Sequence, residues 1–123
     1  MLSKEDNQLL TQTGPGTPMG DMFRRYWIPV LKSEELESDG KPQRIKLLSE
    51  DLIAFRDTEG KVGLIDERCP HRGTSLYFGI NAGCGIRCMY HGWKFDTKGN
   101  CTEIPSEEKD GKFKQSIKLK RYP

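Results

Sequence analysis

The sequence predicts a mainly β fold: a small antiparallel sandwich or barrel preceded by short N-terminal helices. Helix signals occur only before residue 28. From residue 40 onwards, short apolar or alternating segments are separated by turn-forming residues, which is typical of small antiparallel sandwiches and barrels. The length of 123 residues suits one domain with a modest core, to which a bound metal would add stability.

Two short helices are expected first. Ser3 is a suitable N-cap for a helix with carboxylates in its first turn, and the Gly-Pro-Gly sequence at 14–16 ends that helix. Leu9 and Leu10 are expected to face inward. Residues 19–27 are expected to form a second helix whose large apolar side chains join the core or pack against the sheet, namely Met19, Met22, Phe23, Tyr26 and Trp27.

The remaining elements are expected to be strands joined by tight turns. A turn at 49–51 and two Asp-Thr-x-Gly sequences, at 57–60 and 96–99, mark hairpins. The chain is accordingly divided into an N-terminal helical segment, residues 1–39, that packs on a domain formed by residues 40–123. The expected strands are 44–47, 52–56, 61–66, 85–88, 93–95, 100–104 and 114–121.

Composition excludes several classes of protein. The 20 Lys and Arg residues against 18 Asp and Glu residues leave a net charge of +2, too small and too mixed for a nucleic-acid-binding protein. No run approaches the roughly 20 apolar residues of a membrane span, and the acidic N-terminus is unlike a secretory signal peptide. We therefore expect a soluble, cytoplasmic protein whose four cysteines are metal ligands or free thiols rather than disulfides.

Two expected loops concentrate the chemistry. The chain has only two histidines, and each lies beside a cysteine, in Cys-Pro-His at 69–71 and in Cys-Met-Tyr-His at 88–91. Each loop therefore supplies one thiolate and one imidazole. Two thiolates and two imidazoles fit tetrahedral zinc or iron–sulfur ligation, and the candidate ligands are Cys69, His71, Cys88 and His91.

The flanking residues distinguish between these metals. Structural zinc sites usually space a cysteine pair by two to four residues, whereas here each cysteine is paired with a histidine. Gly73 and Gly92 follow the histidines closely, and glycines let backbone amides approach inorganic sulfides and donate hydrogen bonds to them. The pattern favours a [2Fe–2S] cluster of the Rieske type, in which two histidines replace two cysteines on one iron, over zinc or unrelated thiols.

The same segments carry a resemblance to a known family. Cys-Pro-His-Arg-Gly at 69–73 and Cys-Met-Tyr-His-Gly-Trp-Lys-Phe at 88–95 resemble the two cluster loops of Rieske non-haem iron ring-hydroxylating oxygenases. Segments 14–20, 23–27 and 101–107 resemble the N-terminal part of phthalate 4,5-dioxygenase-type oxygenase components. The resemblance implies a Rieske-type fold and a role in an oxidoreductase of aromatic degradation.

The resemblance also implies a ligand set and partners. Cys69 and Cys88 would hold the inner iron of the [2Fe–2S] cluster, and His71 and His91 would hold the outer iron near the surface. A reductase component containing flavin and an iron–sulfur centre would supply electrons. The cluster would pass them to a mononuclear iron in a catalytic domain of the same or a neighbouring subunit, where an aromatic acid or similar substrate is oxidised.

The sequence departs from the family in one respect. A mononuclear site of this kind needs two histidines and a carboxylate, and both histidines of this chain already serve the cluster. We therefore interpret the chain as an electron-transfer domain that lacks the C-terminal catalytic domain and turns over no substrate alone. The alternatives are a free-standing Rieske ferredoxin, which the long segment before residue 40 disfavours, and a zinc-stabilised interaction module.

Several residues outside the ligand set have more than one interpretation. Cys84 and Cys101 are expected to be ordinary packing residues, and Trp93 is expected to shield the cluster from water. Arg72 is expected either to contact a carboxylate of a partner or to be a solvated or loop-bracing arginine. A basic C-terminal stretch is expected to be a solvated strand face, with docking of an acidic redox partner as the alternative; it comprises Lys112, Lys114, Lys118, Lys120 and Arg121.

The resemblance further implies a low reduction potential. High-potential Rieske proteins have a disulfide between the two loops and a serine that donates a hydrogen bond to a sulfide. The matching positions here are Thr74, Tyr90 and Trp93, which supply neither. Because hydrogen bonds to sulfur stabilise the reduced cluster, we expect a potential near the low end of the Rieske range, about −150 mV.

Overall fold

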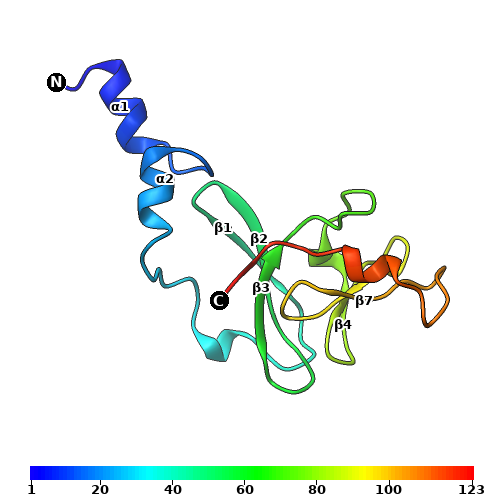
Figure 1. Cartoon of the computed structure of the whole chain (residues 1–123). Coiled ribbons are helices and arrows are strands. Elements are labelled where there is room, and N and C mark those ends of the chain that lie inside the picture. The colour runs from blue at the N-terminus through cyan, green and yellow to red at the C-terminus, as the bar shows by residue number, and fades with distance from the viewer.

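The computed structural model describes residues 1–123 and contains two small antiparallel sheets, with a helical arm that extends away from them (Figure 1). The first sheet has the strand order β1-β2-β3-β8 and the second has the order β4-β5-β6-β7. The predicted mainly β fold with short N-terminal helices is confirmed. None of the helices combines the length and apolar character that crossing a bilayer requires.

The first sheet is built around one buried strand. β1 (Gln43–Leu47), β2 (Glu50–Arg56) and β3 (Val62–Asp66) form a meander, and β8 (Arg121–Tyr122) pairs with β3. Residues 52–55 of β2 are all buried, so both faces of this strand are covered. Its continuous apolar run, in place of an alternating one, is typical of such a strand.

The turn between β1 and β2 lies earlier than predicted. The expected turn at 49–51 is wrong, because Glu50 and Asp51 already pair with β1. The two turn residues are Leu48 and Ser49, with φ angles of 47° and 64°. Two-residue hairpin turns with a positive φ at both positions usually contain Asn or Gly. Leu48 carries no such signal, which is why the sequence pattern placed the turn too late.

The second sheet consists of four very short strands joined by hairpins. They are β4 (Ile80–Asn81), β5 (Ile86–Arg87), β6 (Lys94–Phe95) and β7 (Cys101–Glu103). β4 was not predicted, because two residues are too few to show an alternating pattern. A 3₁₀ helix, η2 (Leu76–Phe78), precedes β4.

One hydrophobic core joins the two sheets. It takes apolar side chains from β2 and β3 of the first sheet and from β5, β6 and β7 of the second. Two of the predicted metal ligands, Cys69 and Cys88, belong to it, so the candidate site is rooted in the core. The twelve core residues are Ile53, Phe55, Ile65, Cys69, Leu76, Ile86, Cys88, Trp93, Phe95, Cys101, Ile104 and Leu119.

The predicted strand at 114–121 is largely wrong. A 3₁₀ helix, η3 (Phe113–Ser116), occupies its first part, and only Arg121–Tyr122 forms a strand. Between them the chain crosses the β6–β7 turn, where the Leu119 N–H donates to a turn carbonyl at 2.7 Å. Leu119 is buried whereas Phe113 is exposed. The basic C-terminal stretch therefore does not form a single strand face.

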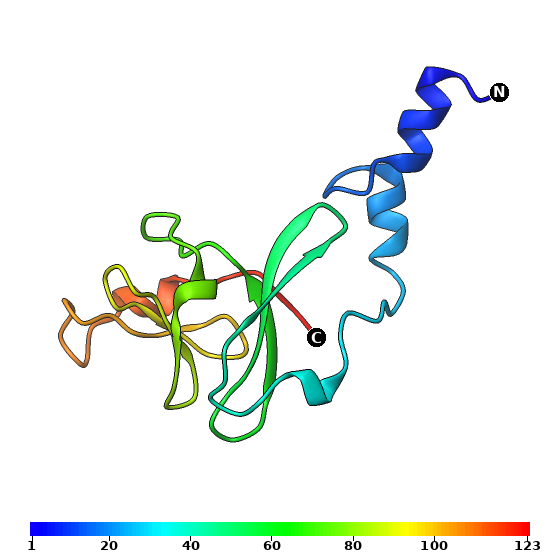
Figure 2. The ribbon, with the colours of Figure 1, turned by 180° about the vertical axis from the view of Figure 1, so that it is seen from behind.

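The arm consists of α1 (Lys4–Thr11) and α2 (Pro18–Phe23), and Figures 1 and 2 show it projecting away from both sheets. The Ser3 cap is confirmed, because its hydroxyl accepts a hydrogen bond from the Asp6 N–H at 3.0 Å. α1 ends before the predicted Gly-Pro-Gly stop, and none of its side chains is buried. The expectation that Leu9 and Leu10 face inward is therefore wrong.

The packing predicted for the second helix is also wrong for most of its side chains. Met22, Tyr26 and Trp27 are exposed, with Trp27 at 84%, and only Met19 and Phe23 are half-buried. The last two aromatic residues lie beyond the end of α2, in the segment that leads back to the domain. Helical spacing identified these residues as one apolar face, but α2 projects away from the sheets, and Tyr26 and Trp27 face the first sheet only across an open groove.

A polar hub joins the arm to the first sheet. Glu50 of β2 accepts hydrogen bonds from Arg24 of the arm, at 2.7 Å, and from Lys120 and Tyr122 near the C-terminus. Burial alone would raise the pKa of the Glu50 carboxyl, but these three donors together outweigh burial and lower the pKa to about 2. The segment after α2 leads to η1 (Ser33–Glu35), where Arg56 of β2 donates to the carbonyl and hydroxyl of Ser33. The division of the chain after residue 39 stays a prediction.

Candidate metal centre

Two loops with the same backbone closure carry the Cys/His pairs. Loop 69–74 follows β3, and loop 88–93 connects β5 to β6. In each loop the cysteine N–H donates to the carbonyl five residues later, at 2.9 and 2.8 Å. The glycine four residues after each cysteine donates back to the cysteine carbonyl, at 2.8 and 3.0 Å. Gly73 and Gly92 have φ angles of 73° and 76°, a conformation that favours glycine.

An arginine immediately before each cysteine braces its loop. Arg68 Nη1 donates to the Gly73 carbonyl at 3.3 Å, and Arg87 Nη1 donates to the Gly92 carbonyl at 2.9 Å. Arg87 also forms an ion pair with Glu103 at 2.6 Å. Sequence reasoning missed both arginines. The available signal was the repeated Arg-Cys dipeptide with a glycine four residues after the cysteine.

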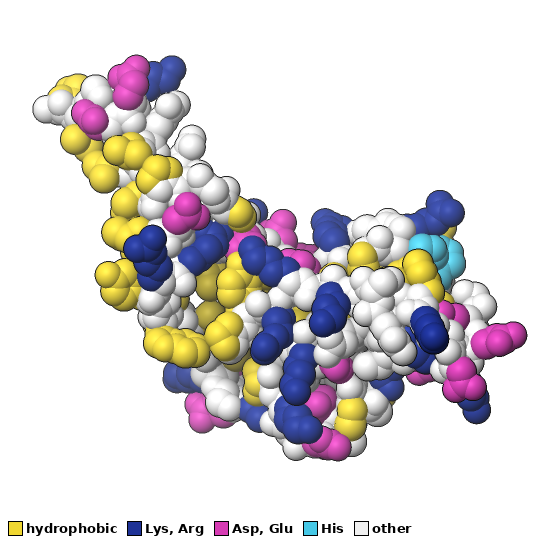
Figure 3. Space-filling model, in the orientation of Figure 1, with side chains coloured by type: hydrophobic (Ala, Val, Ile, Leu, Met, Phe, Trp, Pro, Cys, Tyr) yellow, Lys and Arg dark blue, Asp and Glu magenta, His cyan; other side chains and the backbone are white.

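The structure brings the four predicted ligands together at the end of the molecule away from the arm, where Figure 3 shows histidine on the surface. Cys69 and Cys88 are 2% and 3% exposed, and both belong to the hydrophobic core. His71 and His91 are exposed, with ring centroids 4.5 Å apart and ring planes at 69°. The site therefore has a buried sulfur side and an exposed nitrogen side.

The protonation states of these groups suit metal binding. Burial raises the pKa of the Cys69 thiol to about 11, and the adjacent Cys88 thiol adds to the increase. A metal deprotonates a coordinating thiol outright, so the thiolate forms only when the metal is bound. The pKa of the exposed His71 imidazole is lowered by the loss of part of its hydration and by the nearby His91 and Arg72. Its imidazole is therefore neutral at neutral pH, the form that binds metals.

The donors are arranged as two pairs and not around one point. No three Cys, His, Asp or Glu side chains gather where they could hold a single metal ion. A structural zinc ion takes four ligands around one point, whereas each iron of a [2Fe–2S] cluster takes two protein ligands. Two buried thiols and two exposed imidazoles fit the pattern of two protein ligands on each iron of a [2Fe–2S] cluster.

Aromatic and apolar side chains surround the two imidazoles. Trp93 is buried and stacks on His71, with centroids 4.5 Å apart and ring planes at 7°. Tyr90 lies against His91 at 3.8 Å, and Phe113 meets Trp93 edge-on at 6.2 Å. This position suits the predicted shielding role of Trp93, which stays a prediction.

The extra cysteines lie outside this site. Cys101 is buried in the core, which confirms its predicted packing role. Cys84 is half-buried in the β4–β5 turn with a φ of 63°, where its N–H donates to Thr58 Oγ1 at 3.1 Å. It is a turn residue and not a core residue. All four cysteines are free thiols, so no disulfide links the two loops.

Arg72 does not brace its loop. Its side chain is exposed, and the guanidinium that reaches the Gly73 carbonyl belongs to Arg68. The bracing role predicted for Arg72 is wrong, the exposed side chain fits the predicted solvated arginine, and contact with a partner stays a prediction.

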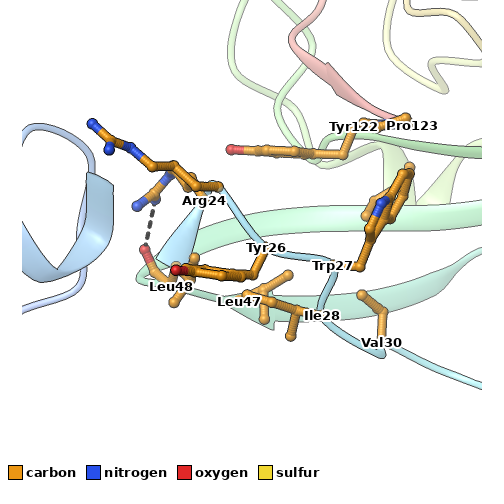
Figure 4. Close-up of a pocket in the computed structure, with 11 residues that line it drawn as sticks. Arg24, Tyr26, Trp27, Ile28, Val30, Leu47, Leu48, Tyr122 and Pro123 are labelled. Carbon is orange, nitrogen blue, oxygen red and sulfur yellow. Dashed lines mark hydrogen bonds between the residues drawn. The ribbon is translucent and has the colours of Figure 1, made fainter. Parts of the chain in front are cut away.

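A groove of about 340 Å³ lies elsewhere, between the segment after α2 and the first sheet. Figure 4 shows Tyr26, Trp27 and Tyr122 around it, together with aliphatic side chains of β1 and its turn. None of the four predicted ligands lines this groove. It is therefore not part of the metal centre.

Comparison with known proteins agrees with the geometry. The Rieske [2Fe–2S] domain family matches residues 26–123. The chain is 51% identical, over its whole length, to the 3-chlorobenzoate-3,4-dioxygenase oxygenase subunit of Comamonas testosteroni. It is 49% identical, over 99% of its length, to the phthalate 4,5-dioxygenase oxygenase subunit of Pseudomonas putida, and it spans 28% of each relative.

A solved structure supports the fold. The crystal structure of dicamba monooxygenase with non-haem iron and dicamba matches with a TM-score of 0.70 at 32% identity, over 80% of this chain and 29% of that one. Together with the two sequence relatives, this match confirms the resemblance inferred from the two loops.

Proposed function

Because the chain belongs to the family of Rieske [2Fe–2S] domains, we propose that Cys69, His71, Cys88 and His91 hold its cluster and that the chain passes single electrons. One observation carries the proposal. Two loops with the same backbone closure bring two buried thiols and two exposed imidazoles together. When bound, the cluster supplies one-electron chemistry at a potential that its protein surroundings set.

Burial favours a specific division of the ligands between the two irons. Cys69 and Cys88 are rooted in the core and would hold the inner iron. His71 and His91 are exposed and would hold the outer iron. Electrons would therefore enter and leave at the histidine end, because the imidazoles are the ligands that a partner can approach.

The chain would act as the electron-transfer domain of an aromatic-ring oxygenase. Support comes from the two relatives, both oxygenase subunits, of which the chain spans 28%. A mononuclear iron of the oxygenase type takes two histidines and a carboxylate, and both histidines here are in the proposed cluster set. Oxidation of the substrate would take place in a catalytic domain of the same or a neighbouring subunit. A reductase component with flavin and an iron–sulfur centre would supply the electrons.

A potentiometric titration with a turnover assay tests this function. The holoprotein, prepared anaerobically, should take up about one electron per chain near −150 mV, because no loop disulfide raises the potential. With a competent reductase, ferrous iron, dioxygen and an aromatic acid, the chain alone should form no hydroxylated product. A midpoint above about +100 mV would contradict the assignment to an oxygenase, and product formation would contradict the absence of a catalytic iron site.

A further inference from the structure

No polar group of the protein orients the imidazole of His71. A histidine that binds a metal usually donates its second N–H to a carboxylate, a backbone carbonyl or water, which fixes the ring. Around these loops the side-chain hydrogen bonds come from Arg68 and Arg87, and they reach glycine carbonyls. Neither His71 nor His91 makes a hydrogen bond to another protein group. Within this chain, the groups that can restrict the rotation of the two imidazoles are therefore the rings beside them.

The two imidazoles differ in the rings beside them. His71 lies flat against Trp93, at 4.5 Å and 7°, and Trp93 is only 9% exposed. His91 lies against Tyr90 at a tilt of 41°, and Tyr90 is itself exposed. A flat stack on a buried ring restricts rotation of the imidazole, whereas a tilted contact with an exposed neighbour does so much less.

Trp93 is itself held by its backbone and by the core. Its carbonyl accepts the Cys88 N–H at 2.8 Å, the bond that closes loop 88–93. Its indole belongs to the hydrophobic core and is only 9% exposed. Phe113 meets the indole edge-on at 83° but is itself exposed, so it adds little restraint. The core therefore holds the indole as a fixed surface for the imidazole that rests on it.

The stack also connects the two loops. His71 belongs to loop 69–74 and Trp93 to loop 88–93, and no disulfide joins these loops. We propose that Trp93 is a positioning residue: its indole holds the His71 ring in the orientation that binds the outer iron, and thereby ties the first loop to the second. This inference rests on the proposed function, because it assumes that His71 is a ligand.

Three variants of the holoprotein separate positioning from packing. Trp93→Leu keeps an apolar side chain and removes the flat ring. Trp93→Phe keeps a flat ring with less overlap. Trp27→Leu is the matched control, because Trp27 is 84% exposed and lies in the segment after α2, away from the four proposed ligands. For each variant, the rate of cluster loss to an excess iron chelator and the electron paramagnetic resonance (EPR) spectrum of the reduced cluster are measured.

The proposal predicts a graded result. Trp93→Leu should lose the cluster about tenfold faster than wild type, the change that about 1.4 kcal/mol produces, which is near the upper end for an aromatic pair. Its EPR g values should shift, because the His71 ring can rotate about the bond to iron. Trp93→Phe should restore the wild-type g values and lose the cluster about threefold faster than wild type. Trp27→Leu should match wild type in both measurements.

Each other result overturns the proposal. A folded Trp93→Leu protein with wild-type g values would mean that the indole only excludes water, whatever its rate of cluster loss. A Trp93→Phe protein that loses the cluster as fast as Trp93→Leu would mean that a flat ring is not what matters. If Trp93→Leu does not fold, the Trp93→Phe protein decides. Cluster loss from it at the wild-type rate would mean that Trp93 serves only core packing.

The cluster content of wild type separates a failure of the proposed function from a failure of the positioning role of Trp93. If wild type contains no cluster, the proposed function fails before Trp93 is tested. If wild type contains the cluster and Trp93→Leu behaves like it, only the positioning role fails.

Discussion

The two Cys/His loops close in the same way but differ in what supports them. In loop 88–93, a Cβ added at Gly92 would come within 2.8 Å of the Pro105 ring, and Arg87 donates to the Gly92 carbonyl at 2.9 Å. In loop 69–74, nothing lies within 4 Å of a Cβ added at Gly73, and Arg68 donates at a longer 3.3 Å. The second loop is packed against its neighbours, whereas the first is open to solvent.

This difference separates what a local pattern determines from what the surroundings determine. The spacing from cysteine to glycine gives both loops one backbone closure. Packing against Pro105 and Glu103 makes only the second loop a fixed platform. The first loop takes its order from the second, through the stack of His71 on Trp93. Substitutions in the two loops should therefore differ in effect, except at the ligands themselves.

The largest effect is expected at the ligands, and there the two loops should respond alike. His71→Ala and His91→Ala should each lose the cluster or grossly change its visible spectrum, because each removes one outer-iron ligand and the chain has no other histidine. Cys84→Ser and Cys101→Ser are the controls and should keep the cluster, since both lie outside the two pairs. Bleaching by Cys84→Ser together with a normal spectrum in His71→Ala would show that the ligand set is wrong.

Alanine substitutions at Gly73 and Gly92 should show how differently the two loops are supported. Gly73→Ala should cost about 1 kcal/mol of unfolding free energy, from the positive φ alone. Gly92→Ala should cost about 3 kcal/mol, because the new methyl group also displaces Pro105. Guanidinium unfolding of the two holoproteins measures both values. Equal losses would mean that the second loop is not held more tightly than the first.

The polar hub gives a smaller effect that leaves both loops unchanged. Glu50→Gln should lower stability by about 2 kcal/mol at neutral pH, because the carboxylate has three donors and its pKa is lowered to about 2. Since the folded pKa lies below the usual value of 4.5, this stability is present above pH 4.5 and is lost as the pH falls towards 2. As the pH falls from 4.5 towards 2, wild type should lose this contribution to stability, whereas Glu50→Gln has none to lose. A changed cluster spectrum in Glu50→Gln would contradict the separation of hub and loops.

The smallest effect is expected in α1. Leu9→Ser should change the free energy of unfolding by less than about 0.5 kcal/mol, because no side chain of this helix is buried. The cluster spectrum should stay the same. Thermal unfolding of the holoprotein measures the difference, and a loss above about 1 kcal/mol would show that the arm packs on the domain in solution.

Sequence patterns predicted those features that depend on neighbouring residues. The Ser3 cap, the two Asp-Thr-x-Gly turns and the loop character of the Cys/His segments depend on local chemistry, and the structure shows them as expected. Helical spacing also found the apolar face of the arm. It could not tell whether anything covers that face, and Trp27 turned out to be exposed.

The candidate site likewise combines features that the sequence predicts with features that it cannot show. The four proposed ligands were identified from residue types and spacing alone, because the chain has only two histidines and each lies beside a cysteine. The stack on Trp93 could not be read from the sequence, since it joins residues on different loops. The bracing of the loops by Arg68 and Arg87 was readable in principle, from the repeated Arg-Cys dipeptide. The prediction of a strand at 114–121 was wrong because η3 occupies its first part and the chain then passes over the β6–β7 turn, so most of this segment forms no strand pairing.

Metal and sulfide analysis of anaerobically prepared wild-type protein shows whether the two loops hold a [2Fe–2S] cluster. Two loops that hold a Rieske cluster through Cys69, His71, Cys88 and His91 should give about two irons and about two acid-labile sulfides per chain. Stoichiometric zinc with no sulfide would contradict this account.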